Sequence, residues 1–211
     1  MEKRVIRVQG EGKVSVEPDL AVLTFSVQVK HPEYAGCSNA LNANVARLRR
    51  DLAACGIESA RVKTMNLNIA VDTAYEEGRT KFVGFQASHT LRVEIPADKD
   101  LLNRVFLAIA QGNSDAQVQI AFSVKDQAAL LRQSLEQAVK TATENAQILA
   151  RAANVKLGAL LEMNYGETSV RVYEQREMLM AQSVAGGAAP VDIEPENVRA
   201  ENTVTLVWEI A

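Results

Sequence analysis

Apolar and polar residues alternate along the first thirty positions in two separate runs. The first run, Val5–Val16, places its apolar residues on even positions, and Gly10 and Gly12 fall on that same face. After a turn at 17–19 the apolar positions become odd, and the alternation continues to Val29. A period of two is typical of strands with one buried face. We therefore predict two strands, with room opposite the two glycines for a bulge, a bend or a close-packed neighbour.

Three longer segments repeat their apolar residues every three or four positions, which is the period of a helix. The first spans about 32–55, where Pro32 suits the first turn and Gly56 the C-terminal cap. A second, shorter helix has Asp98 as its N-cap. The longest runs from about 126 to 153. Its expected buried stripe is narrow and rich in alanine: Leu131, Leu135, Ala138, Ala142, Leu149 and Ala153.

A long antiparallel hairpin is predicted between residues 65 and 95, with its turn at 75–79. Both strands alternate cleanly, so one face is expected to lie in the core and the other in water. The residues expected on the core face are Met65, Leu67, Ile69, Val71, Val83, Phe85, Ala87, His89, Leu91, Val93 and Ile95. Three more strands are expected at 118–124, 161–165 and 204–210.

The predicted elements follow one another without the regular alternation of a doubly wound parallel sheet. We therefore predict an α+β fold with mainly antiparallel sheets, in which the long hairpin packs against two long helices and one shorter helix. At 211 residues the chain suits a single domain, 1–211, that can be divided into two lobes of about 1–95 and 96–211.

One long segment, 167–202, shows no firm period and contains a stretch of small residues at 183–190. Connections of this length are uncommon in compact domains and are usually functional or disordered. We interpret the segment as a partly flexible arm that packs on another subunit, folds back on its own subunit or stays disordered. The residues proposed to support the structure or a subunit contact are Gly10, Gly12, Tyr173, Met178, Leu179 and Met180.

Composition and charge argue against several classes of function. The net charge of −3 and the lack of a basic run give no general attraction to nucleic acid, so no nucleic-acid partner is expected. No apolar run approaches the roughly 18 residues that indicate a transmembrane helix. The first four residues lead directly into a strand without a signal-peptide pattern. A cytoplasmic protein is therefore expected, or a periplasmic one if an export signal has been removed.

No catalytic, cofactor or metal motif stands out in the sequence. The chain has only two histidines, His31 and His89, and neither belongs to the Cys/His spacing of a metal site. Cys37 and Cys55 lie about five turns apart on one predicted helix face. That separation is too long for a disulfide and indicates two buried free thiols. No catalytic residue, cofactor or metal is expected, and a non-enzymatic protein is favoured.

Several short segments, taken in order along the chain, resemble the SIMPL-domain family of YggE-like bacterial proteins, one of which is a periplasmic immunogenic protein. They include VQGEG at 8–12, Pro18-Asp19, GFQA at 84–87, 142–153 with Gly158, and 200–210. The resemblance implies an α+β fold, assembly into large rings or channel-like oligomers, and a part in bacterial defence against oxidative stress. It supplies no catalytic residues. An animal member that associates with a kinase gives an adaptor role a precedent.

The sequence leaves three hypotheses for function. The leading one is a non-enzymatic homo-oligomer whose surfaces bind partners during stress, including a protein partner that the sequence does not identify. The second is a small-molecule-binding module or enzyme that uses a groove between the hairpin and the helices. The third is a cytoplasmic adaptor for a signalling protein. A mass measurement in solution separates the first hypothesis from the other two.

Overall fold

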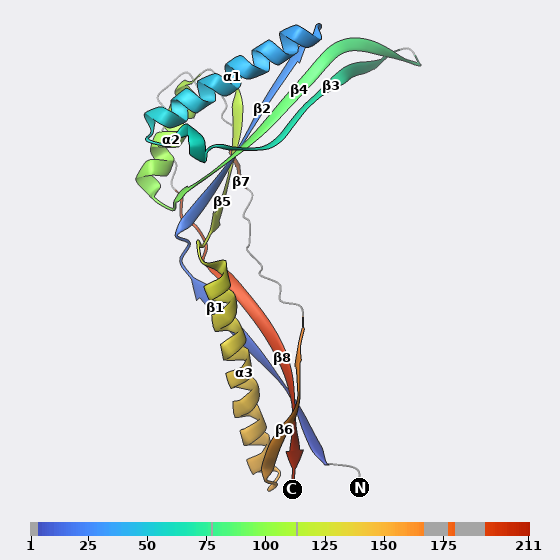
Figure 1. Ribbon diagram of the computed structural model, residues 1–211, viewed down its shortest axis with the longest axis vertical. Coiled ribbons are helices and arrows are strands. Elements are labelled where there is room, and N and C mark those ends of the chain that lie inside the picture. The colour runs from blue at the N-terminus through green and yellow to red at the C-terminus, as the bar shows by residue number, and fades with distance from the viewer. Residues whose placement is uncertain (1–3, 77, 113, 167–176, 180–192) are drawn as a thin grey trace. The chain divides into compact units, whose positions relative to one another are not determined.

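The computed structural model describes residues 4–76, 78–112, 114–166, 177–179 and 193–211. Within these ranges the chain has the predicted α+β fold, and five strand pairs have a defined antiparallel register. The chain forms two compact units, each assembled from stretches that are far apart in the sequence (Figure 1). Unit 1 comprises Met1–Pro18, Ser123–Tyr173 and Pro195–Ala211, and unit 2 comprises Asp19–Phe122 and Glu174–Glu194.

These units differ from the contiguous lobes 1–95 and 96–211, and the reason is the partner of the first strand. β1 (Val5–Val16) pairs along its whole length with the last strand, β8 (Val198–Ile210). β2 (Leu20–His31), which follows β1 after a short turn, belongs to a different sheet. Unit 1 is therefore closed by the two strands nearest the ends of the sequence.

Unit 1 consists of one long helix on a three-stranded sheet. The strand order is β1-β8-β6, where β6 is Leu157–Tyr165. α3 (Gln127–Ala152) packs mainly on β1 and β8. The helix begins close to residue 126 as predicted, and Asp126 caps it: the Asp126 carboxylate accepts a hydrogen bond from the backbone N–H of Ala129 at 2.7 Å. The main core of this unit contains Val8, Ala138, Ala142, Ala146, Val204, Leu206 and Trp208.

The buried stripe of α3 is rich in alanine and includes Ala138 and Ala142 as predicted, but its other members differ from the prediction. The structure buries every fourth residue: Leu130, Ser134, Ala138, Ala142, Ala146 and Ala150. Leu131 and Leu135 are only half-buried, and Leu149 and Ala153 are exposed. Side chains longer than alanine do not fit where the helix lies closest to β1, so the row of small residues turns inward and the leucines move to its flank.

Unit 2 places two helices over a five-stranded sheet with the order β3-β4-β2-β5-β7. The strands besides β2 are β3 (Lys63–Glu76), β4 (Arg79–Pro96), β5 (Ala116–Ser123) and β7 (Glu177–Leu179). The two helices are α1 (Tyr34–Ala54) and α2 (Lys99–Gln111), and a short 3₁₀ turn, η1 (Ser59–Arg61), follows α1. Of the two long helices, only α1 lies in the same unit as the hairpin.

The core of unit 2 lies between β2, β4 and the two helices. Its largest fully buried side chains include Phe25, Leu23, Leu41, Leu48, Leu52, Leu91, Ile95 and Leu102. α2 is capped by Asp98, whose carboxylate accepts from the N–H of Leu101 at 2.9 Å, as predicted. Among the described residues, none of the helices combines the length and the apolar character that crossing a membrane requires.

Candidate interaction surface

The β3–β4 hairpin is longer than the helix that covers it. α1 has 21 residues and spans roughly 31 Å, whereas β4 has 18 residues and spans roughly 60 Å. Figure 1 shows the two strands continuing past the N-terminal end of α1. α1 packs on β2 and β4, and β3 forms the edge of the sheet beyond them. Among the described residues of unit 2, a large part of the hairpin therefore has no helix above it.

The register of the hairpin shows which residues share the side on which α1 lies. Ala87 is fully buried in the core beneath α1, and it pairs with Ile69. Directly opposed residues in an antiparallel pair lie on the same face, and residues two apart along a strand do as well. The partners of Leu67 and Ile69 on this side are His89, which contacts Thr64, and Ala87, which lies beneath α1. We leave these two partners out and define the hairpin face as the other residues on this side from the middle of the hairpin to its tip: Leu67, Ile69, Val71, Thr73, Tyr75, Thr80, Phe82 and Phe85.

Two irregularities in the register change the alternation that the sequence suggests. β3 has an extra residue at Met65, and β4 has an extra residue at Val83. The second bulge brings Phe82, instead of Val83, onto the same face as Phe85. Gly84, next to this bulge, has φ +155°, and a Cβ there would lie 2.6 Å from the carbonyl oxygen of His31. The prediction that Met65 and Val83 continue the core face is therefore wrong.

The hairpin face is apolar and open to solvent. Its most exposed side chains are Leu67 (56%), Val71 (58%), Tyr75 (77%) and Phe82 (60%). The predicted core position of Leu67 and Val71 is thus wrong, because α1 packs on β2 and β4 and leaves the edge strand β3 exposed. Ala87, Leu91, Val93 and Ile95, nearer the helices, are buried as predicted.

Aromatic rings form a cluster where the hairpin face meets the start of α1. The ring of Phe85 makes edge-to-face contacts with Tyr34, at 5.5 Å between centroids, and with Phe82, at 5.4 Å. Tyr34 is itself 56% exposed. Together with Tyr75, four of the chain's aromatic residues (five Phe, four Tyr and one Trp) lie in this small region. Aromatic residues are enriched at protein interfaces.

The charged residues of the outer hairpin occupy the other face. Asp72, Arg79 and Lys81 all alternate with the residues of the hairpin face in the register. The carboxylate of Asp72 accepts from the Lys30 ammonium of β2 at 2.8 Å, on that opposite side. None of the eight residues of the hairpin face is charged at neutral pH. The hairpin is therefore amphipathic along its whole exposed length.

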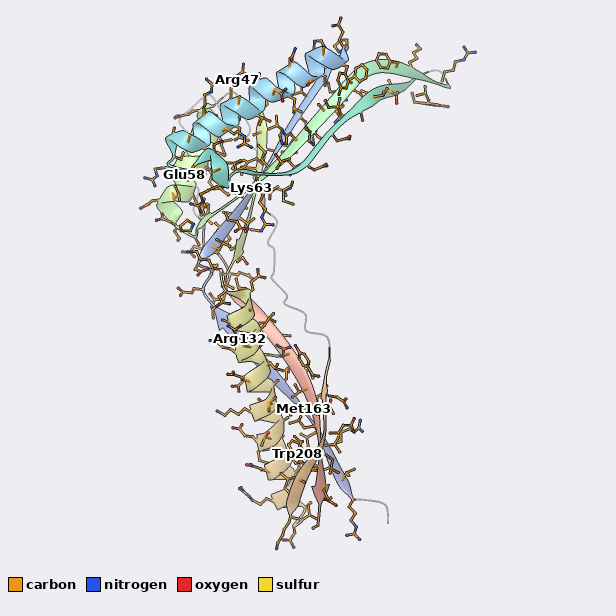
Figure 2. The ribbon with its side chains drawn as sticks, viewed as in Figure 1. Arg47, Glu58, Lys63, Arg132, Met163 and Trp208 are labelled. Carbon is orange, nitrogen blue, oxygen red and sulfur yellow. The ribbon has the colours of Figure 1, made fainter. Side chains whose placement is uncertain are left out.

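Unit 1 contains a second, smaller apolar surface of the same kind. Leu160, Met163 and Tyr165 of β6 pair with the core residues Trp208, Leu206 and Val204 of β8, and so share the face that α3 covers. Because α3 lies over β1 and β8, these three side chains remain between 44% and 55% exposed. Figure 2 shows Met163 and Trp208 on these neighbouring strands.

The two histidines occupy structural positions. His89 Nε2 lies 3.0 Å from Thr64 Oγ1 and joins β4 to β3, while its Nδ1 is buried without a hydrogen-bond partner. Burial and, to a smaller extent, the nearby Arg49 lower the pKa of His89 from 6.5. His31 Nδ1 accepts a hydrogen bond from the backbone N–H of Glu33 at 3.0 Å, just before α1.

The two thiols have different environments. Cys37 is fully buried, and its Sγ lies 3.4 Å from the carbonyl oxygen of Phe85. Cys55 is partly exposed, which corrects the prediction that both thiols are buried. Burial is the main cause that raises the pKa of Cys55, so its thiolate is disfavoured. Among the described residues, no three His, Cys, Asp or Glu side chains are grouped as a metal ion would need.

The residues proposed from the sequence are spread over both units. Gly10 and Gly12 face α3, where a Cβ would lie 2.2 Å from Ala138 O and 1.9 Å from Ser134 O respectively. The close-packed neighbour expected opposite the glycines is thus α3. Met178 and Leu179 lie in β7, whose backbone pairs with β5. Tyr173 and Met180 lie outside the described residues.

Fold and surface together define a two-unit α+β protein whose outer strands carry exposed apolar faces. A family model described as SIMPL, a protein of unknown function (DUF541), matches residues 6–208, and the chain belongs to this family.

Several named proteins align with most of this chain at low sequence identity. It is 22% identical to the uncharacterized protein YggE of Edwardsiella ictaluri over 204 residues, which cover 96% of this chain and 85% of that protein. It is likewise 22% identical to YggE of Escherichia coli K12 over 209 residues, covering 97% and 82%. It is 28% identical to the 26 kDa periplasmic immunogenic protein of Brucella melitensis over 170 residues, covering 75% and 65%.

The hairpin face was not among the residues proposed from the sequence. Its alternation was recognised, but alternation shows which residues share a face and not whether anything covers that face. The length of the predicted hairpin could have indicated the open face, since the predicted helix that precedes the hairpin is too short to cover it. The aromatic residues around the turn, Tyr75, Phe82 and Phe85, were a second signal.

Proposed function

We propose that the chain is a non-enzymatic interaction protein that acts as a homo-oligomer. The observation that carries this proposal is the hairpin face, an uncharged apolar surface whose outer part is not covered by any helix among the described residues of unit 2. Exposed apolar surface costs roughly 25 cal/mol per Å² relative to burial. Contiguous apolar patches on soluble proteins usually mark a site of association.

The histidine, cysteine and arginine side chains that could take part in catalysis make structural contacts instead, which supports a non-enzymatic role. His89 is tied to Thr64, His31 accepts from the Glu33 backbone, and the Cys37 thiol is buried. Arg49, beside His89, donates to the carbonyl oxygens of Ser59 at 3.0 Å and Val62 at 3.3 Å. These groups hold the helix and strands together, and none of them pairs a nucleophile with a general base.

The mass in solution tests the proposal directly. Light scattering or sedimentation across micromolar concentrations should give a species of at least twice the 23.0 kDa chain mass. The measurement should be repeated at high salt, where an interface formed by apolar side chains persists while one formed by surface ion pairs weakens. A chain that stays monomeric at every concentration would contradict the homo-oligomer.

We also propose a part in defence against oxidative stress, supported by the family resemblance, and a periplasmic location. Two relatives, from Brucella melitensis and Brucella abortus, are each named 26 kDa periplasmic immunogenic protein. Cell fractionation with compartment marker enzymes tests the location, with the cytoplasm as the alternative. Survival of a deletion strain in hydrogen peroxide, with and without the restored gene, tests the stress role. Equal survival would contradict that role.

A further inference from the structure

We infer that the hairpin face packs against the same face of a second copy of the chain, around a two-fold axis. This inference rests on the proposed homo-oligomer and specifies one contact within it. The occupant of the face is the identical surface Leu67, Ile69, Val71, Thr73, Tyr75, Thr80, Phe82 and Phe85 of the partner chain.

The first support is that the face is complementary to itself. In a two-fold contact each residue meets the same surface of its partner, so any charge would meet an equal charge or be left without a partner. The eight residues of the hairpin face carry no charge, and Asp72, Arg79 and Lys81 all lie on the opposite side. Two copies can therefore approach face to face without burying a charge.

The second support is the area that the face offers. A standard interface buries about 800 Å² on each partner, and a large aromatic side chain can bury about 150–250 Å². Tyr75, Phe82 and the adjoining Tyr34 are each more than half exposed, and Leu67 and Val71 add two aliphatic side chains. The face thus supplies several hundred Å² per copy, which approaches the area that a stable dimer needs.

The third support is the geometry of sheet packing. Pairing along the β3 edge would extend the sheet but would leave the side chains of the hairpin face in water, because side chains project perpendicular to the sheet. Only a layer placed on the face removes them from water. Two twisted ribbons pack face to face about 10 Å apart, with the inner side chains interdigitating.

Site-specific cross-linking tests the contact in the full-length chain. Thr73→Cys places a thiol in the middle of the hairpin face, and Ala70→Cys places one on the opposite face of the same strand. Both variants are made with Cys55→Ser, so that the other remaining thiol is the buried Cys37. Backbones about 10 Å apart exceed disulfide range, so a short bismaleimide is used. We expect a covalent dimer from Thr73→Cys and none from Ala70→Cys.

A charge placed on the face provides the second measurement. Phe82→Lys should raise the dissociation constant of the dimer about tenfold or more, because the lysine is buried against an apolar surface. Ala70→Lys adds the same charge to the other face of the hairpin and should leave the dissociation constant unchanged. Circular dichroism and the denaturant midpoint show whether each variant keeps its fold.

The outcomes separate this inference from the proposed function. An oligomeric wild type without the Thr73→Cys cross-link, or with unchanged association in Phe82→Lys, overturns the inference and leaves the homo-oligomer intact. A monomeric wild type overturns both. Vesicles of phosphatidylglycerol and phosphatidylcholine test a different occupant. A wild-type monomer that sediments with these vesicles, when Phe82→Lys does not, assigns the face to lipid and overturns the inference.

Discussion

At the scale of single residues, the smallest side chains determine the packing of unit 1. Gly10 and Gly12 bring the backbone of β1 against the backbone of α3, and Ala138 and Ala142 complete the contact. Close packing of this kind leaves no space for an added side chain. Asn202, opposite Gly12 in the sheet, donates to the carbonyl oxygen of Leu131 at 3.2 Å and fixes the same region through a polar contact.

Gly12→Val should destabilise unit 1. The Cβ would lie 1.9 Å from Ser134 O and 2.5 Å from Ala138 N, and because both are helix backbone atoms, the whole helix must shift. Overpacking of a core usually costs about 1–3 kcal/mol. The measurement is the urea midpoint of unfolding. Gly166→Val is the matched control, since a Cβ there meets nothing within 4 Å. Equal midpoints for the two variants would contradict the close packing.

His89 should make the stability depend on pH. Burial and Arg49 lower its pKa in the folded chain from 6.5. As the pH falls through about 6.5, the unfolded chain therefore takes up the proton before the folded chain does. The free energy of unfolding should decrease in this window and be independent of His89 above it. His89→Gln should show a smaller decrease between about pH 7.5 and pH 5. An identical decrease in both proteins would rule out this role of His89.

At the scale of helices and strands, the sequence predicts where each element lies and where it ends. It predicts less well which strands pair and which faces another element covers. Asp98 was predicted as a cap and accepts the expected backbone hydrogen bond. The helix that begins near residue 126 was predicted as well, but its cap, Asp126, was not. The bulge at Val83 was missed because Phe82 and Val83 are both apolar, so the pattern allows either one to face inward. Gly84 was the local sign of that irregularity.

Strand partners were harder to predict than strand positions. β1 and β2 are both clean period-two segments joined by a short turn, which is equally compatible with a hairpin. The structure instead pairs β1 with β8 and β2 with β4. That choice depends on contacts between residues far apart in the sequence, which a local pattern does not contain. The hairpin face was missed for the same reason.

The cap of α3 gives a prediction at this scale. Asp126→Ala removes the acceptor for the N–H of Ala129 and should cost about 0.5–2 kcal/mol of stability. Asp126→Asn keeps a side-chain oxygen at the same place and should restore most of the loss. Urea unfolding of the three proteins measures both differences. A loss in the alanine variant that asparagine fails to restore would show that the carboxylate acts in another way.

At the scale of the whole molecule, each unit has a main core of its own. One contains Phe25, Leu91 and α1, and the other contains Trp208, Leu206 and the alanines of α3. Each unit also has an outer strand whose apolar face is left open, β3 in unit 2 and β6 in unit 1. Under the proposed function these strands are the places where a copy or a partner adds the missing layer.

Hydrogen exchange should report the two cores separately. Gly12→Val should speed the exchange of amides in β1, β8 and α3, whose packing it disturbs. Amides in β2 and β4 should keep their wild-type rates, because local stability follows the core to which each strand belongs. The experiment compares both proteins under native conditions by mass spectrometry. Equal acceleration in both sets of strands would mean that the chain unfolds as one cooperative unit.

The pairing of β1 with β8 also sets an order of events during synthesis. Val5 leaves the ribosome well before its partner in the sheet, Glu209, is made. Residues 19–122 supply most of unit 2 and can fold while the ribosome is still working. The apolar faces of β1 and α3 stay exposed until β8 has been made, because β1 and β8 are far apart in the sequence. A chaperone can thus bind the nascent β1 strand throughout the synthesis of the residues between β1 and β8.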